Sequence, residues 1–152
     1  MIKMNKLTDY AVILLSHMEG SSKDRLLTVS DLSEETGLGQ ATISKILKIL
    51  GKTDIVNSVR GINGGYYIGR PLNDISVADM IETMDGPLAM TACVESHGGE
   101  CCSSETNCTI KGGWDALNGE MIELLRGFPI SKIVEQAQSN YKIEQNLKTA
   151  TG

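Results

Sequence analysis

The chain has 152 residues, 41% of them hydrophobic, and a formal net charge of −5. This length fits one domain, and no apolar run reaches the roughly 18 to 20 residues that a membrane span needs. The charge argues against indiscriminate nucleic-acid binding, yet it is unevenly spread. Residues 1–75 carry nine Lys/Arg and eight Asp/Glu, whereas residues 76–152 carry five and eleven. A locally basic surface is therefore still expected in the first half of the chain.

The N-terminal segment has the apolar spacing of an amphipathic helix. Steps of three, four and seven separate its apolar residues. They are Leu7, Tyr10, Ala11, Leu14, Leu15 and Met18. The segment has no small-residue cleavage site, so it is predicted to be a helix rather than a signal peptide, and the protein is expected to be cytoplasmic.

Two short helices are predicted between residues 28 and 53. Thr28 and Asp31 form a weak capping-box pattern before the first helix, and Gly37 is placed to end it. Isoleucines and leucines line the inner side of the second helix, whereas its other sides carry small, amide and lysine side chains. The lysines Lys45, Lys48 and Lys52 lie in a stretch without acids. Two helices joined by a glycine-containing turn are typical of a helix-turn-helix.

A β-hairpin is predicted directly after this helix pair. The run IVNSVR is rich in β-forming residues, INGG is a glycine-rich turn, and YYIGRP is a second β-rich run. Asn63-Gly64 favours a tight turn with positive φ. With Arg60 and Arg70 flanking it, the hairpin predicts the wing of a winged helix, whose arginines can reach phosphates or a narrow minor groove. A hairpin that only closes the core is the competing interpretation.

Three further helices are predicted after Pro71. The sequence ISVADMIETMD gives one, with Ser76 as its N-cap and Gly86-Pro87 ending it. The next carries a strong apolar stripe, which consists of Trp114, Leu117, Met121, Leu124, Leu125 and Phe128. Such a stripe suits packing against a second copy in a two-fold dimer, although packing inside one chain is an alternative. A short last helix is expected at 131–138 and a flexible tail at 139–152.

All four cysteines lie between Cys93 and Cys108, within a polar segment that is expected to be a loop. Thiolates are soft ligands suited to zinc, Cu(I) and iron–sulfur clusters. In a reducing compartment, clustered cysteines favour metal binding or redox chemistry over a disulfide framework. The lack of a CxxC pair disfavours structural zinc. An enzyme with a catalytic cysteine is disfavoured as well, because His17 and His97 are the only histidines and give no convincing Cys–His–carboxylate arrangement.

Several stretches together resemble one family. They are KLTDYAVILL, TISKILKIL, SVRGINGGYYIGRP, ISVADMIETMDGP, and then MTAC, GECC, a last cysteine and a tryptophan, across roughly residues 1–138. The chain is similar to the iron–sulfur winged-helix transcriptional regulators related to IscR and NsrR, and most of all to those of the SUF assembly system. The resemblance implies a mainly α fold with a small β-wing, and a homodimer formed by a long helix beside the cluster loop.

The resemblance also implies a three-cysteine cluster site. Its ligands would be Cys93, Cys102 and Cys108, with Cys101 as the alternative to Cys102, because the family keeps five residues between its last two cysteines. The histidine that IscR-like members use as fourth ligand is replaced by Lys111. NsrR-like members use an aspartate of the other subunit's first helix, which here is Asp9. His97 is another candidate. This ligand set favours a 4Fe-4S cluster, and a 2Fe-2S cluster stays open.

The function implied is a dimeric regulator, expected to be a repressor, that binds double-stranded operator DNA and controls iron–sulfur assembly genes according to cluster status. The expected DNA-binding residues are Gln40, Ala41, Thr42, Ser44, Lys45, Lys48 and Arg60. A metal-free regulator that responds to thiol oxidation or nitric oxide is the alternative. The expected organisation is a winged helix-turn-helix domain at 1–86, a cluster-binding loop at 87–111, dimerisation and docking helices at 112–138, and the tail.

Overall fold

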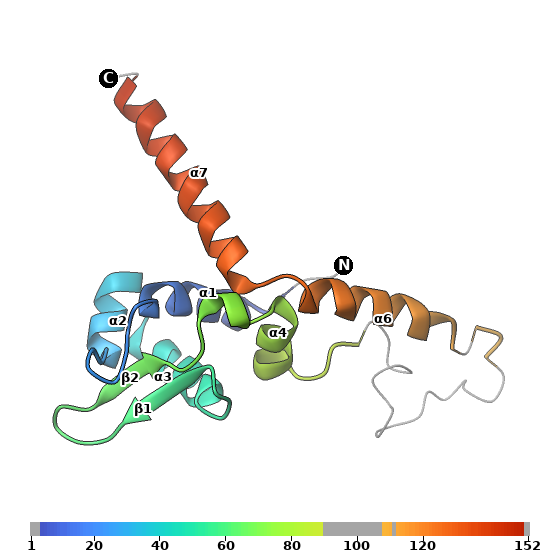
Figure 1. Cartoon of the computed structure of the whole chain (residues 1–152), viewed down its shortest axis with the longest axis horizontal. Helices are drawn as coiled ribbons and strands as arrows, with labels where there is room; N and C mark the ends of the chain where they lie inside the picture. Colours follow the sequence, from blue (N-terminus) through green and yellow to red (C-terminus); the bar gives the residue numbers. More distant parts are fainter. Residues whose placement is uncertain (1–3, 90–107, 111, 151–152) are drawn as a thin grey trace.

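The computed structural model describes residues 4–89, 108–110 and 112–150, and for residues 142–150 it describes the backbone alone. In the described part, seven elements from α1 to α4 form a compact body, and two further helices leave it (Figure 1). The mainly α fold with a small β-wing is confirmed. No helix in these ranges is both long and apolar enough to cross a membrane.

Helix α1 (Lys6–Met18) lies at the centre of the body and packs on α2, α3 and α4. The Asn5 side chain accepts a hydrogen bond from the Leu7 N–H and caps the helix, as asparagine does at this position. The apolar face that the sequence predicts is confirmed. Leu14, Leu15 and Met18 have no exposed surface, so α1 supplies much of the core.

Helices α2 (Val29–Thr36) and α3 (Gln40–Leu50) form the predicted helix-turn-helix. Thr28 and Asp31 exchange hydrogen bonds in a full capping box, in which the carboxylate accepts from the Thr28 N–H at 2.8 Å. These hydrogen bonds, that from the Thr28 N–H first and that from its hydroxyl second, lower the pKa of Asp31. Gly37 ends α2 with φ +71°, a conformation that glycine adopts without strain.

The wing consists of β1 (Val56–Val59) and β2 (Gly65–Ile68), paired antiparallel with Val56 opposite Ile68 and Val59 opposite Gly65. Its loop differs from the prediction. Five residues, 60–64, join the strands, and the positive φ of +123° occurs at Gly61 rather than at Asn63 or Gly64. At Gly64 a side chain would overlap the Val59 carbonyl, so this glycine is required for close approach.

The 3₁₀ turn η1 (Leu72–Asp74) leads to α4 (Val77–Asp85), which Ser76 caps as predicted, with Asp79 completing a capping box. The start of α4 is also tied to a distant part of the chain. The Val77 N–H donates to the Phe128 carbonyl, and the Ile130 N–H donates to the Ile75 carbonyl at 2.8 Å. These bonds fix the junction between the last two helices against the body.

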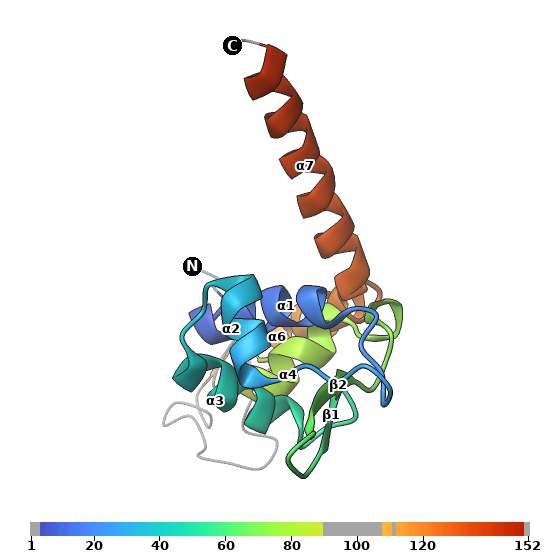
Figure 2. The same cartoon turned by 90° about the vertical axis from the view of Figure 1, so that its left-hand side faces the viewer.

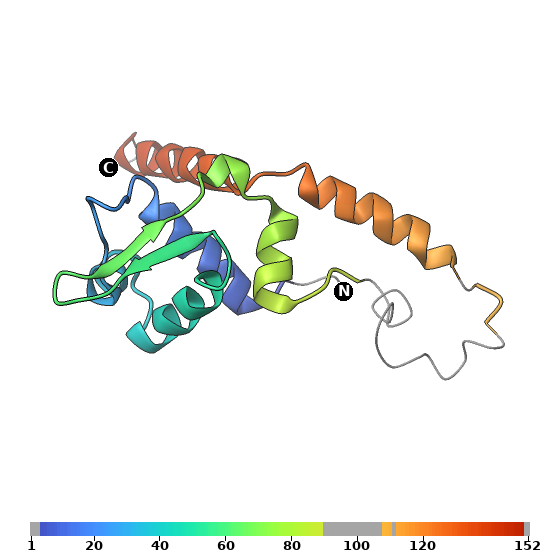
Figure 3. The same cartoon turned by 60° about the horizontal axis from the view of Figure 1, so that its bottom comes forward.

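Helix α6 (Gly113–Arg126) begins far from the body and returns to it at its C-terminal end, where it contacts α4 (Figures 1 and 3). Helix α7 (Ile130–Ala150) then projects from the other side of the body. The predicted helix at 131–138 is therefore too short, since one 21-residue helix spans this region, and the flexibility of the tail at 139–152 stays a prediction. The glutamine, glutamate, lysine and alanine residues of α7 favour helix although they show no apolar period.

Candidate nucleic-acid interface and cysteine region

Helix α3 is amphipathic, with one apolar side and one polar side. Ile43, Ile46, Leu47 and Leu50 are buried in the core, and this orientation fixes what the helix presents to solvent. The exposed residues are Gln40, Ala41, Ser44, Lys45 and Lys48, with Thr42 half-buried beside them. Small and amide side chains at the N-terminal end can approach base edges, and lysines farther along can reach phosphates. The structure thus brings six of the seven predicted DNA-binding residues onto one helix surface.

The seventh, Arg60, is exposed at the end of β1, where the wing loop begins. No aspartate or glutamate occurs between Asp54 and Asp74, so the whole wing is free of acidic side chains. The wing and α3 lie on the same side of the body, and α7 projects from the opposite side (Figures 1 and 2). A polyanion can therefore approach α3 and the wing together without meeting a carboxylate on the wing.

The exposed side of α6 carries charged residues and, beside them, a row of apolar ones. Its exposed members are Trp114, Leu117 and Leu124, of which Leu124 is 71% exposed. Asn118 lies on the inner side and donates from Nδ2 toward the Leu88 carbonyl at 3.5 Å. The predicted stripe is therefore divided, because Met121 and Leu125 are half-buried whereas the other leucines and the tryptophan face solvent.

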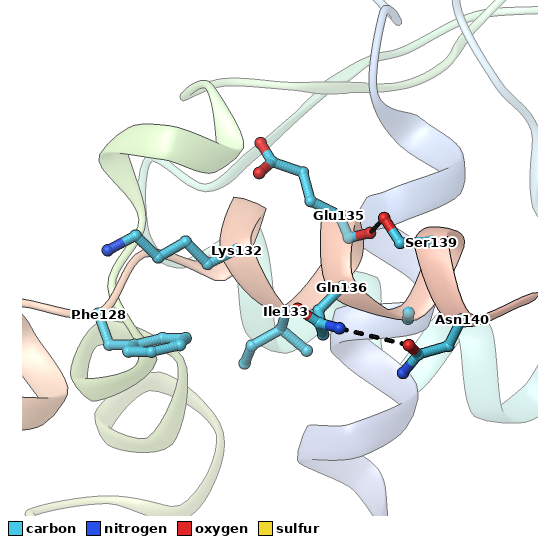
Figure 4. A pocket seen from close by; sticks show the side chains of 8 residues that line it. Phe128, Lys132, Ile133, Glu135, Gln136, Ser139 and Asn140 are labelled. Carbon is cyan, nitrogen blue, oxygen red and sulfur yellow. Dashed lines mark hydrogen bonds between the residues drawn. The ribbon is translucent and has the colours of Figure 1, made fainter. Parts of the chain in front are cut away.

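A shallow groove continues this apolar surface onto α7 (Figure 4). Phe128 and Ile133 are exposed along it, and the Lys132 ammonium lies 5.4 Å from the centre of the Phe128 ring. Gln136 donates to Asn140 at 3.3 Å farther along the groove. The apolar lining residues are Phe128, Ile133 and Ala137, and the polar ones are Lys132, Glu135, Gln136, Ser139 and Asn140. Polar side chains therefore form most of the lining of this groove.

The cysteine region is described at one end only. Cys108 is half-buried and not in a disulfide, and it lies before α6 at the end of that helix farthest from the body. The predicted ligands Cys93, Cys101, Cys102 and His97, and Lys111 at the position of the family histidine, lie outside the described residues. Within the described ranges, no group of three His, Cys, Asp or Glu is placed to hold a metal ion.

Asp9 is exposed on α1, as a ligand supplied to another subunit must be. Helix α1 lies within the body, whereas the segment that contains Cys108 is held away from it by the length of α6 (Figures 1 and 3). The structure therefore does not bring Asp9 and Cys108 of one chain together. His17, at the other end of α1, has its Nδ1 3.6 Å from a carboxylate oxygen of Glu35 in α2, at the surface of the body.

Two features of the structure were not predicted from the sequence. Thr8 is fully buried, and its hydroxyl donates to the Asp85 carboxylate at 2.8 Å, which joins α1 to the end of α4. A threonine among polar neighbours carried no signal for this contact. Ile62, at the tip of the wing, is fully exposed. Its exposure could have been predicted, because Ile62 is a lone apolar residue between Gly61 and Asn63 in a glycine-rich turn.

Together, the helix-turn-helix, the acid-free wing and the exposed polar side of α3 define a winged helix-turn-helix DNA-binding protein. The Rrf2 family model, described as an iron-dependent transcriptional regulator, matches residues 4–136. The chain belongs to the Rrf2 family of transcriptional regulators.

Solved structures of other proteins share this fold. The chain is similar to CymR (YrzC), the global cysteine regulator of B. subtilis, with 17% identity, a TM-score of 0.65, and coverage of 90% of this chain and 98% of that chain. It is similar to T. potens IscR, with 20% identity, a TM-score of 0.58, and coverage of 90% and 88%. It is also similar to the oxidized form of Staphylococcus aureus CymR, with 20% identity, a TM-score of 0.59, and coverage of 88% and 97%. At these identities the similarity concerns the fold.

Proposed function

We propose that this protein is a homodimeric repressor that binds operator DNA and controls iron–sulfur assembly genes through a cluster held between its subunits. The observation that carries the DNA-binding part is the shared orientation of α3 and the wing. Helix α3, which carries Lys45 and Lys48, and the wing, whose loop begins at Arg60, lie on one side of the body (Figure 2), and the wing has no acid. In this arrangement α3 enters the major groove while Arg60 reaches the adjacent phosphates or minor groove.

The exposed apolar surface of α6 supports the dimer. A soluble monomer seldom leaves a continuous row of large apolar side chains facing water. Trp114, Leu117 and Leu124 form such a row, and Phe128 extends it toward α7. A second copy packed on this row gives a two-fold dimer, and a two-fold dimer reads two half-sites of a palindromic operator.

The donor set fits an iron–sulfur cluster. Cys93, Cys102 and Cys108 would supply three thiolates, with Cys101 as the alternative to Cys102, and Asp9 of the other subunit would supply a carboxylate. The exposure of Asp9 agrees with a ligand set that spans two subunits. A 4Fe-4S cluster is favoured over 2Fe-2S. When bound, it supplies a centre that oxygen, nitric oxide or iron shortage can alter.

The chain's own residues connect this site to the DNA-binding surface. Asp9 follows Thr8, whose hydroxyl is bonded to Asp85 at the end of α4, and α4 also packs on α3. A displacement of α1 at Asp9 would therefore reach the helices that position α3. A coupling of about 1 to 3 kcal/mol between the two sites would change operator affinity about five- to 150-fold.

Mössbauer spectroscopy of anaerobically isolated protein tests the cluster and its fourth ligand. The wild type is expected to give the signal of a 4Fe-4S cluster and to contain acid-labile sulfide, and Asp9→Ala to hold less iron or to give an altered signal. Identical spectra from the two proteins would exclude Asp9 as a ligand. Protein without iron or sulfide would contradict cluster binding and leave DNA binding to be judged separately.

The DNA-binding part is tested with Arg60→Ala. Binding of the dimer to duplex DNA is expected to weaken, and the salt dependence of binding to decrease by about one phosphate contact. Arg25→Ala removes an exposed arginine from the turn between α1 and α2 and is the control. Unchanged affinity and salt dependence for Arg60→Ala would show that the wing does not contact DNA.

A metal-free thiol switch is the second candidate. It is favoured by the adjacent Cys101 and Cys102, which the three-thiolate site does not both need, and by the similarity of fold to an oxidized CymR. A colourless protein whose thiols are lost on mild oxidation, with a parallel change in DNA affinity, would support this function over the cluster.

A further inference from the structure

The tip of the wing has a fixed shape that projects one apolar side chain. The last strand pair joins Val59 to Gly65, and the Gly64 N–H donates to the Gly61 carbonyl at 3.0 Å to close the turn. Gly61 has φ +123°, and Gly64 has no room for a side chain. These two glycines determine the backbone path of the turn, and this path holds Ile62 at the apex of the loop.

Ile62 is the most exposed large apolar residue in the described part of the chain. Its relative exposure is 105%, whereas the next, Leu124, has 71%. Leu124 belongs to the apolar row on α6, which is remote from the wing (Figure 1). Ile62 instead stands beside Arg60 and Asn63, both exposed, on a hairpin without acidic side chains. These neighbours fit a polyanion rather than an apolar protein surface.

We propose that Ile62 enters the minor groove of bound DNA and makes the wing select A·T pairs there, an inference that rests on the proposed DNA-binding function. The wing lies on the same side of the body as α3, so its tip reaches the groove that flanks the α3 contact (Figure 2). The walls of that groove are deoxyribose carbons, against which an isoleucine can pack. Apolar side chains are common in minor-groove binding.

The selectivity follows from the chemistry of the groove floor. A G·C pair places the guanine N2 amino group there, whereas an A·T pair presents acceptors alone and no protruding group. The branched side chain of Ile62 would collide with the amino group and leave it without a hydrogen-bond acceptor. Hypoxanthine paired with cytosine lacks that amino group, so I·C pairs have the minor-groove surface of A·T pairs and the major-groove surface of G·C pairs.

The test uses a duplex that the wild-type dimer selects from a random-sequence pool, with the wing contacts located by hydroxyl-radical footprinting. Replacing A·T by G·C at those positions is expected to weaken wild-type binding about tenfold, and I·C to restore it to within about twofold. Ile62→Ala is expected to bind the A·T duplex about fivefold more weakly and to lose most of the discrimination, with an unchanged salt slope. Ile62→Val should retain both properties.

Three results would overturn the proposal. The first is that Ile62→Ala keeps wild-type affinity and discrimination. The second is that I·C behaves as G·C, which would place the selectivity in the major groove. The third is a lower Tm or altered dimerisation of Ile62→Ala, which would mean that this side chain packs on protein. If the wild type selects no duplex at all, the proposed DNA-binding function fails with it, whereas each of the three results leaves that function intact.

Discussion

The Thr8 hydroxyl donates a hydrogen bond of 2.8 Å to the Asp85 carboxylate and so joins the first turn of α1 to the last residue of α4. Seventy-seven positions separate the two residues in the chain. A carboxylate at a helix C-terminus is unfavourable by itself, because the helix dipole is negative there. Its hydrogen bond to a fully buried threonine offsets part of that cost and fixes α4 against α1.

Thr8→Val, which keeps the shape and removes the hydroxyl, is expected to lower the free energy of unfolding by about 1 kcal/mol. Urea denaturation followed by circular dichroism measures this change. Thr8→Ser is the control, since it keeps the donor and should lose less than Val if the hydrogen bond is the main contribution. Equal stability of the wild type and Thr8→Val would show that the bond contributes nothing net.

We expect the ionisation of Asp31 to make the stability of the folded protein depend on pH. Its pKa is below the ordinary value of 3.8, chiefly because the charged carboxylate accepts the Thr28 N–H. A depressed folded-state pKa gives stabilisation that is present above the ordinary pKa and is lost as the pH falls through the lower folded value. Asp31→Asn should therefore have a lower Tm than the wild type at neutral pH, and the gap should close as the pH falls below 3.8 and through the lower folded-state pKa.

Asp24→Asn is the matched control for the loss of one carboxylate, because Asp24 is exposed in the turn before α2 and belongs to no capping box. If this variant shows the same closing gap as Asp31→Asn, the effect comes from net charge. A constant gap for Asp31→Asn across the pH range would contradict the role of the ionised carboxylate in the cap.

The lysines of α3 are expected to act through phosphates. Lys45→Ala and Lys48→Ala should each weaken binding to all duplexes alike and lower the salt slope by about one contact. Fluorescence anisotropy over a salt series measures both effects. Lys23→Ala, which removes an exposed lysine from the turn between α1 and α2, is the control. A change in base preference for either α3 variant would indicate that the lysine reads bases.

Leu124→Glu tests the dimer. The side chain is largely exposed in one chain, so the substitution should leave the helical fold intact and place a charge in the proposed interface. Sedimentation equilibrium is expected to show a monomer that has lost most operator affinity. Glu120→Gln, another exposed residue one turn earlier on α6, should remain dimeric. A dimeric Leu124→Glu protein would locate the interface elsewhere.

The fold was predictable where local chemistry and tertiary packing agree. The apolar period of α1, the capping residues Thr28 and Ser76, and the order of helix pair and hairpin all act locally and survive in the structure. The wing loop was not predictable in detail. Asn63-Gly64 suits a two-residue turn, but in the structure Gly64 is held against the Val59 carbonyl and the turn extends to Gly61.

The site was predictable only in its local part. The exposed side of α3 is the side that the core does not bury, so the apolar period of this helix was enough to predict which of its residues face solvent. The Thr8–Asp85 bond could not, because it depends on how two helices distant in sequence approach each other. Helix α7 was missed beyond residue 138 because polar residues form it without an apolar stripe, and periodicity detects only helices that bury one side.

Within the described residues, helix α6 is tied to α4 at its C-terminal end, where Arg126 lies 3.7 Å from Glu82 and the chain turns at Gly127. Farther along the helix, Asn118 contacts the Leu88 carbonyl. The 14 residues of α6 make a rod about 21 Å long, so a rotation of about 10° at its C-terminal end would move the opposite end by about 4 Å. Conversely, a shift of a few ångströms at the start of α6, near Cys108, would rotate the helix only slightly where it contacts α4. We expect a movement at the start of α6 to reach α4, which packs on α3, as a smaller displacement.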